Sequence, residues 1–195
     1  MSYLDAAVAW HKSEKARLRA IDDWIRAGMD ITNPLKPFVA PYASNDGPAG
    51  ARKKFALDRL REAIEDEERI ALLRIFAAFE ADFRMTLHQM LHRACARLRP
   101  TSGALPPGQD DLKHLPTMQH CMPLASGFEP SFSSSDRNAL EKLRSFRNNV
   151  MHQGFREKPA DDVDDVAALC ARVVNIFSEA RDSPAPLQAV DALAV

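Results

Sequence analysis

The stretch from residue 51 to residue 98 contains neither proline nor glycine. Proline interrupts a helix and glycine weakens it, so their absence over this length favours continuous helix. Apolar residues follow at helical spacing: Leu57, Leu60, Ile64, Leu72, Ile75, Phe76, Phe79, Phe83, Leu87, Met90 and Leu91. The pattern predicts either one helix of roughly 70 Å, at 1.5 Å per residue, or two helices broken near Glu65–Arg69. We interpret the acidic residues of 65–69 as a solvated face.

Three further segments have helical periodicity, and no segment has the alternation of a strand, so the sequence predicts an all-α fold. Residues 4–27 form the first, although His11 and Lys15 interrupt their apolar spacing. Ser133 to Asp136 offer N-caps for a helix that continues through residue 152. Residues 162–180 form the last. The inward positions of these last two helices are Leu140, Leu143, Phe146, Val150, Val163, Val166, Leu169, Cys170, Val173, Ile176 and Phe177.

Proline-rich segments separate these helices. Four prolines in residues 30–50 predict an irregular connector, and six prolines with three glycines in residues 100–134 predict a long loop. Loops of this length usually serve a function, and we expect this one to be mobile and to gate a site on the helix that follows. We predict one domain over residues 1–182, with a core bundle in 51–182 after the N-terminal helix and connector of 1–50. Residues 183–195 are expected to be a disordered tail.

Charge and cysteine content narrow the function classes. The net charge of −1 lacks the overall basic character of a duplex-DNA binder. Residues 51–100 nevertheless contain eleven Lys and Arg residues against eight Asp and Glu, which favours a local basic patch. Three widely spaced cysteines do not suggest a disulfide framework. With no signal-peptide pattern and no apolar run of roughly 20 residues, we expect a cytoplasmic protein without a membrane span.

The sequence Arg147-Asn148-Asn149-Val150-Met151-His152 carries the clearest chemistry. Histidine exchanges protons near neutral pH, and arginine is a permanent cation whose fork of donors fits phosphate. These two side chains are the minimum required to cleave RNA without a metal, because one moves a proton and the other stabilises charge on phosphorus. On a helix, Arg144, Asn148 and His152 lie four residues apart on one stripe. Arg147 lies beside that stripe.

This Arg147–His152 pattern, in the last third of a helical chain, resembles the motif of the HEPN superfamily. That motif is an arginine, often followed by a polar residue such as Asn148, with a histidine after four to six further residues. The long preceding helix also resembles the HEPN helix that packs against the motif helix and often carries a Phe-Glu pair, here Phe79-Glu80. The resemblance extends over about residues 55–180.

The resemblance implies a helical bundle that forms a homodimer with the motif helices facing each other. Catalytic HEPN proteins are endoribonucleases that need no metal or other cofactor, and many act in defence or as toxins. By resemblance, His152 would be the general acid or base, Arg147 the phosphate clamp and Asn148 an orienting amide. Arg144 and Glu80 would contact the RNA substrate. An antitoxin or regulatory protein is a further implied partner, although Gly154 replaces the tyrosine that one toxin subgroup uses for such control.

Other functions remain open at this stage. Some HEPN proteins are non-catalytic, so a dimeric module that binds RNA or a protein partner is the alternative to a nuclease. In a third interpretation the protein is a helical structural or adaptor protein and the motif is accidental, since Arg and His near a helix C-terminus also cap carbonyl groups.

Two further patterns have both a functional and a structural interpretation. His88, His92 and Cys95 share a helical face and could bind zinc if His114, His120 or Cys121 supplied a fourth ligand, but a surface face with a small buried cysteine explains them more simply. A basic patch could form from Arg84, Arg93, Arg97, Arg99 and Arg144, but no aromatic residues interleave with it to stack bases. No cysteine has an activating neighbour that would make it a nucleophile.

Overall fold

The computed structural model describes residues 2–27, 48–98, 121–122, 125, 129, 131–153 and 162–182, without the side chains of 49, 91–98 and 151–153. Most of this part of the chain belongs to the helices α1 (Tyr3–Arg26), α2 (Ala49–Leu98), α4 (Ser134–Gln153) and α5 (Val163–Asp182). No residue of these described ranges is in a strand, which confirms the all-α prediction. The predicted connector, most of the loop 100–134 and the tail 183–195 lie outside the described residues.

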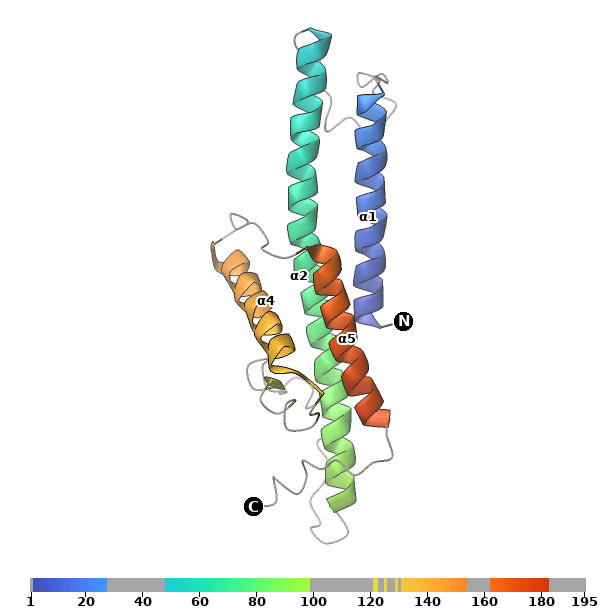
Figure 1. Ribbon diagram of the computed structural model, residues 1–195, viewed down its shortest axis with the longest axis vertical. Coiled ribbons are helices and arrows are strands. Elements are labelled where there is room, and N and C mark those ends of the chain that lie inside the picture. Colours follow the sequence, from blue (N-terminus) through green and yellow to red (C-terminus); the bar gives the residue numbers. More distant parts are fainter. Residues whose placement is uncertain are drawn as a thin grey trace.

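Helix α2 is one continuous helix of 50 residues and forms the axis of the molecule (Figure 1). The alternative of two helices broken near Glu65–Arg69 is therefore wrong. In the acidic stretch there, Asp66 and Glu68 are exposed, as expected of a solvated face, but the side chain of Glu67 is buried. Glu67 pairs with His11 of α1.

Helix α1 runs antiparallel to α2 and is anchored at its start. Ser2 and Asp5 form a capping box, in which each side chain accepts from the other residue's backbone N–H. The buried carboxylate of Asp82 on α2 accepts from the backbone N–H groups of Tyr3 and Leu4, at 3.3 and 2.8 Å. Since the first turn of a helix has N–H groups without intrahelical acceptors, Asp82 satisfies two of them and fixes where α1 begins along α2.

The C-terminal half of α2 is covered by α4, α5 and the N-terminal part of α1 (Figure 1). An aromatic cluster lies at its centre, and Phe83 contacts Phe79, Phe132 and Phe177 at centroid distances of 5.3, 6.5 and 5.0 Å. Burying a phenylalanine stabilises a fold by roughly 1.5–3 kcal/mol, so this cluster is a main source of stability. The inward positions predicted for α4 and α5 are buried, except that Phe146, Leu169 and Ile176 are only half-buried. On the predicted apolar line of α2, Leu57 and Ile64 are half-buried, and the side chain of Leu91 lies outside the described residues.

The N-terminal half of α2 pairs with the C-terminal half of α1 and projects beyond α4 and α5 (Figure 1). Its core is a smaller cluster of buried residues: Leu18, Ile21, Ile25, Ala56 and Leu60. Between this small core and the aromatic core lies a polar layer that contains His11 and Glu67. No helix of the described part of the chain is long and apolar enough to cross a membrane.

Candidate functional site

The motif helix α4 is attached to α2 through an ion pair. Nη2 of Arg147 donates to Oε1 of Glu80 at 3.0 Å. The Arg147 guanidinium also lies over the ring of Phe76, with Cζ at 5.9 Å from the ring centroid, which is within the range of a cation–π contact. The structure thus brings together Arg147 and Glu80, two of the residues singled out from the sequence.

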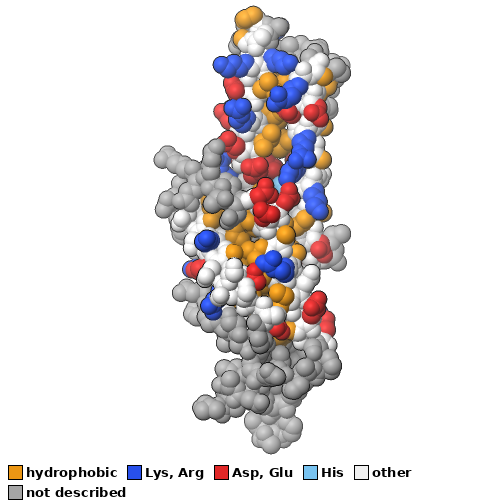
Figure 2. All heavy atoms as spheres, viewed as in Figure 1, with side chains coloured by type: hydrophobic (Ala, Val, Ile, Leu, Met, Phe, Trp, Pro, Cys, Tyr) orange, Lys and Arg blue, Asp and Glu red, His pale blue; other side chains and the backbone are white. Residues whose placement is uncertain are grey.

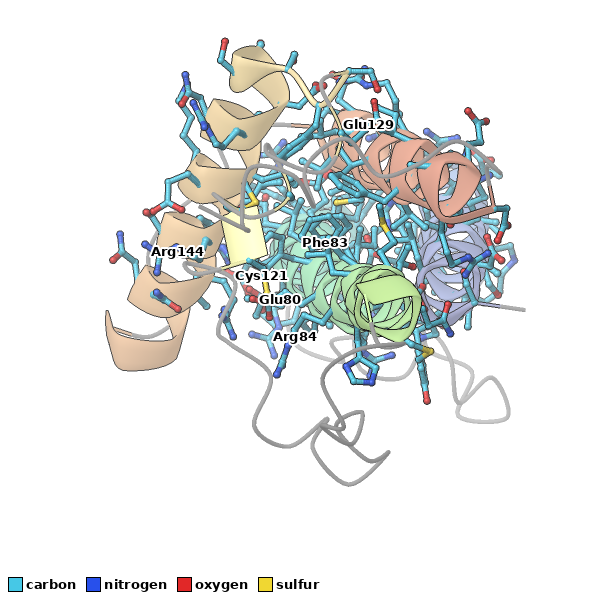
Figure 3. All side chains as sticks on the ribbon, turned by 90° about the horizontal axis from the view of Figure 1, so that it is seen from below. Glu80, Phe83, Arg84, Cys121, Glu129 and Arg144 are labelled. Atoms are coloured by element: carbon cyan, nitrogen blue, oxygen red, sulfur yellow. The ribbon has the colours of Figure 1, made fainter. Side chains whose placement is uncertain are left out.

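Glu80 has more than one arginine around it. The positive charges of Arg147, Arg84 and Arg144 all act on its carboxylate. Burial raises the pKa of Glu80 above its usual value, and the three arginines oppose this shift only in part. Figure 3 shows Glu80 and Arg84 on the side of α2 that faces α4, beside Cys121, with Arg144 on α4. These three arginines outnumber Glu80 and Glu141, the carboxylate that pairs with Arg144, so the α2–α4 junction keeps a net positive charge, which favours an anion such as phosphate.

The arginines differ in how firmly they are held. Arg144 donates to Glu141 one turn earlier through Nε and Nη2, at 2.9 and 2.5 Å. This pair lies at the surface, and the Glu141 side chain is 48% exposed. Arg147 uses one of its five N–H donors on Glu80, and its buried Nε has no hydrogen-bond partner among the described residues. Arg147 therefore retains donors for a further acceptor.

The other two motif residues follow along α4. Asn148 is half-buried and lies next to Arg147. His152 belongs to the last turn of α4, but its side chain lies outside the described residues. Because the helix continues through Gln153, Arg144, Asn148 and His152 do share one stripe of α4 at intervals of four residues.

The described cysteines are not activated. Burial raises the pKa of Cys121, although Arg84 opposes the shift, and burial raises the pKa of Cys170 to about 12. Both thiols stay protonated at neutral pH and are poor nucleophiles. Of the residues considered as zinc ligands, only the side chains of His88 and Cys121 are described. Among described residues, no three His, Cys, Asp or Glu side chains are arranged to hold a metal ion.

A second polar centre, around His11 and Glu67, was missed by the sequence analysis. Both residues are buried, at 1% and 8% exposure, and Nδ1 of His11 lies 2.7 Å from Oε1 of Glu67. The signal was present, since His11 occupies an inward position between Leu4 and Leu18, but we took it as an interruption of the apolar pattern. A polar residue at a core position indicates a buried partner, which periodicity alone does not identify.

No family model, curated protein sequence or solved structure with which we compared the chain matches it.

Proposed function

We propose that the protein is a metal-independent endoribonuclease of the HEPN type that acts as a homodimer. The observation that carries this proposal is the position of Arg147, held by Glu80 at a junction that also contains Arg84 and the Arg144–Glu141 pair and keeps a net positive charge. The helix that presents Arg147 also carries His152, five residues further along. Phosphodiester cleavage without a metal requires a group that transfers protons and cations that stabilise the charge on phosphorus, and α4 carries residues of both kinds.

In the proposed reaction, the 2′-hydroxyl oxygen of RNA attacks the adjacent phosphorus and the bond to the 5′-oxygen breaks. One His152 accepts the 2′-hydroxyl proton, and His152 of the second protomer donates a proton to the leaving 5′-oxygen. Arg147 stabilises the negative charge that develops on the phosphorane oxygens. The products are a 2′,3′-cyclic phosphate and a free 5′-hydroxyl. Two copies related by a two-fold axis supply both proton roles, which a single imidazole in one protonation state does not.

The test is cleavage of an end-labelled RNA in EDTA at several pH values. We expect cleavage by the wild-type protein, with a pH profile that needs one protonated and one neutral imidazole, and no cleavage by His152→Ala. His88→Ala is the matched control, because His88 is a half-buried histidine on a different helix. The nuclease proposal is wrong if the wild-type protein leaves RNA intact or if His152→Ala cleaves at the wild-type rate.

A non-catalytic module that binds RNA or a protein partner is the second candidate. The specific observation in its favour is that Glu80 already occupies one donor of Arg147 and partly neutralises it, which weakens a phosphate clamp. Light scattering and a filter-binding assay separate the candidates. A dimer that retains RNA without cleaving it supports the binding module, whereas a strict monomer at tens of micromolar removes the composite site of two His152 side chains.

A further inference from the structure

The polar layer between the two cores of the bundle contains a histidine whose orientation is fixed. His11 of α1 is 1% exposed, and its Nδ1 lies 2.7 Å from Oε1 of Glu67 on α2. Because a carboxylate can only accept, Nδ1 of His11 carries a proton and donates it to Glu67, and in the neutral form of the imidazole this is the one proton of the ring nitrogens. The other ring nitrogen, Nε2, is then an acceptor.

Nε2 of His11 has no hydrogen-bond partner among the described residues. The nearest ionic group is Oδ1 of Asp164, at 3.8 Å, which is too far for a hydrogen bond and is itself an acceptor. Asp164 instead binds Nζ of Lys15 through its other oxygen, at 2.5 Å. A buried acceptor that faces a second acceptor is unfavourable, and a donor placed between them would relieve it.

Space for such a donor is present. A cavity of about 150 Å³ lies where α1, α2 and the start of α5 meet, and His11 and Glu67 line its buried part. The side chains of Leu18, Ile64 and Val163 form an apolar wall of this cavity. One water needs roughly 10–15 Å³ measured in this way, so the cavity can hold a ligand of several non-hydrogen atoms.

The mouth of the cavity has mixed charge but is acidic on balance. Glu68, Asp162 and Arg19 line it and are exposed, while the ammonium of Lys15 is already paired with Asp164. Figure 2 shows acidic side chains gathered at this level of the visible face. The cavity therefore has two buried polar residues, His11 and Glu67, in its wall and carboxylates at its entrance.

The charges and the apolar wall of the cavity determine which class of ligand it can bind. An anion would meet the buried carboxylate of Glu67 and is disfavoured. A metal ion is disfavoured too, because no three described His, Cys, Asp or Glu side chains are arranged to coordinate one. A cation held by hydrogen bonds remains, and the apolar wall requires that it carry a hydrocarbon body.

We propose that this cavity binds a small aliphatic amine in its ammonium form. The ammonium group donates to Nε2 of His11 and to Glu67, the carbon chain packs against Leu18, Ile64 and Val163, and a second ammonium group of a diamine reaches Glu68 and Asp162 at the mouth. Binding at this place ties α1, α2 and α5 together. The proposal is independent of the proposed nuclease function, because none of these residues belongs to the α2–α4 junction.

The experiment measures the binding of 1,4-diaminobutane to the full chain by calorimetry and by thermal unfolding. For a ligand of this size we expect a Kd on the order of 0.1–1 mM. At about 10 mM ligand, such binding should raise Tm by about 3–10 °C. Butylamine, with one ammonium group, should bind more weakly, and 1-butanol should not bind. Sodium chloride at equal ionic strength controls for general screening of charge.

Glu67→Gln keeps an acceptor for Nδ1–H but removes the negative charge, and it should weaken diamine binding by tenfold or more. The matched control is Asp58→Asn, which removes an exposed carboxylate of the same helix away from the cavity. Where Glu67→Gln does not fold, the exposed double variant Glu68→Gln/Asp162→Asn replaces it, because an asparagine is as good an N-cap for α5 as the aspartate is. The proposal is wrong if the wild-type protein does not bind the diamine. It is also wrong if the cavity variant, Glu67→Gln or its replacement, binds the diamine as tightly as Asp58→Asn does.

Discussion

Two glutamates of α2, Glu67 and Glu80, each hold a residue of another helix, but in contrasting surroundings. They lie 13 residues apart, or roughly 20 Å along the helix axis. Glu67 is paired with a histidine that is almost completely buried, and the nearby charges are mostly acidic. Glu80 is paired with Arg147, whose side chain is 35% exposed, and its other close charges are two more arginines.

The difference separates a buried contact that joins the two cores of the bundle from a contact at a partly open helix junction. His11–Glu67 lies between the two cores of the bundle, so removing either partner leaves the other buried without compensation. Arg147–Glu80 lies at a partly open helix junction, where water or a phosphate can replace a lost partner. We therefore expect changes at the first pair to alter stability and changes at the second to alter RNA chemistry.

The largest expected effect is on stability, at His11. His11→Leu should lower the free energy of unfolding by about 3–5 kcal/mol, because Glu67 keeps its burial and loses its donor. The double variant His11→Leu/Glu67→Met, with two apolar side chains of similar volume, should recover much of this loss. Urea denaturation at neutral pH measures both. If His11→Leu lowers the free energy of unfolding by less than roughly 1 kcal/mol, the His11–Glu67 pair contributes no more to stability than an exposed ion pair does.

The next effect is on activity, at Arg147. Arg147→Lys should slow RNA cleavage by roughly 10²–10³, about 3–4 kcal/mol of barrier, because a point charge cannot replace the guanidinium fork on a phosphorane. The cleavage assay in EDTA measures the rate. Arg59→Lys is the control, since Arg59 is exposed and pairs with Glu62 of its own helix, away from the junction. Equal rates for the two variants would place Arg147 in a purely structural role.

The two glutamate sites also differ in how well they can be predicted from local sequence patterns. Helix positions and the buried aromatic line followed from periodicity, since Phe76, Phe79 and Phe83 recur at helical spacing in a run without proline or glycine. Arg147 was singled out as a candidate because it belongs to a short local motif. His11 and Glu67 are 56 residues apart, and neither local pattern identifies the other residue. Such pairs depend on how α1 docks on α2, which is a tertiary property.

A smaller effect, dependent on pH, is expected at Glu80. Its folded-state pKa is raised by burial, so the folded protein holds this proton more tightly than the unfolded chain does. The stability contributed by protonated Glu80 is present below its unfolded pKa and is lost as pH rises through the raised folded pKa. Glu80→Gln does not titrate, so it should become more stable relative to wild type as pH rises from about 4 to about 7.

Chemical denaturation of wild type and Glu80→Gln at several pH values measures this difference. Asp58→Asn is again a suitable control, because Asp58 is exposed on the same helix. A stability difference between Glu80→Gln and wild type that falls with rising pH would mean that Arg147, Arg84 and Arg144 outweigh burial at this carboxylate. The α2–α4 junction would then be a closed ion-pair network and a weaker candidate for phosphate binding.

The smallest effect is expected at Lys15, on the rim of the His11 site. Lys15 and Asp164 are 31% and 56% exposed, and hydrogen bonding to Lys15 lowers the pKa of Asp164. Because that pKa is lowered, the stabilisation is present above the unfolded pKa of Asp164 and is lost as pH falls through its folded pKa. Exposed pairs contribute about 0.2–1 kcal/mol, so Lys15→Met should cost no more than this at neutral pH, and less in about 1 M salt. A loss of several kcal/mol that persists in high salt would contradict this expectation. Lys15 and Asp164 would then belong, with His11 and Glu67, to one structural ion-pair network rather than to an exposed rim.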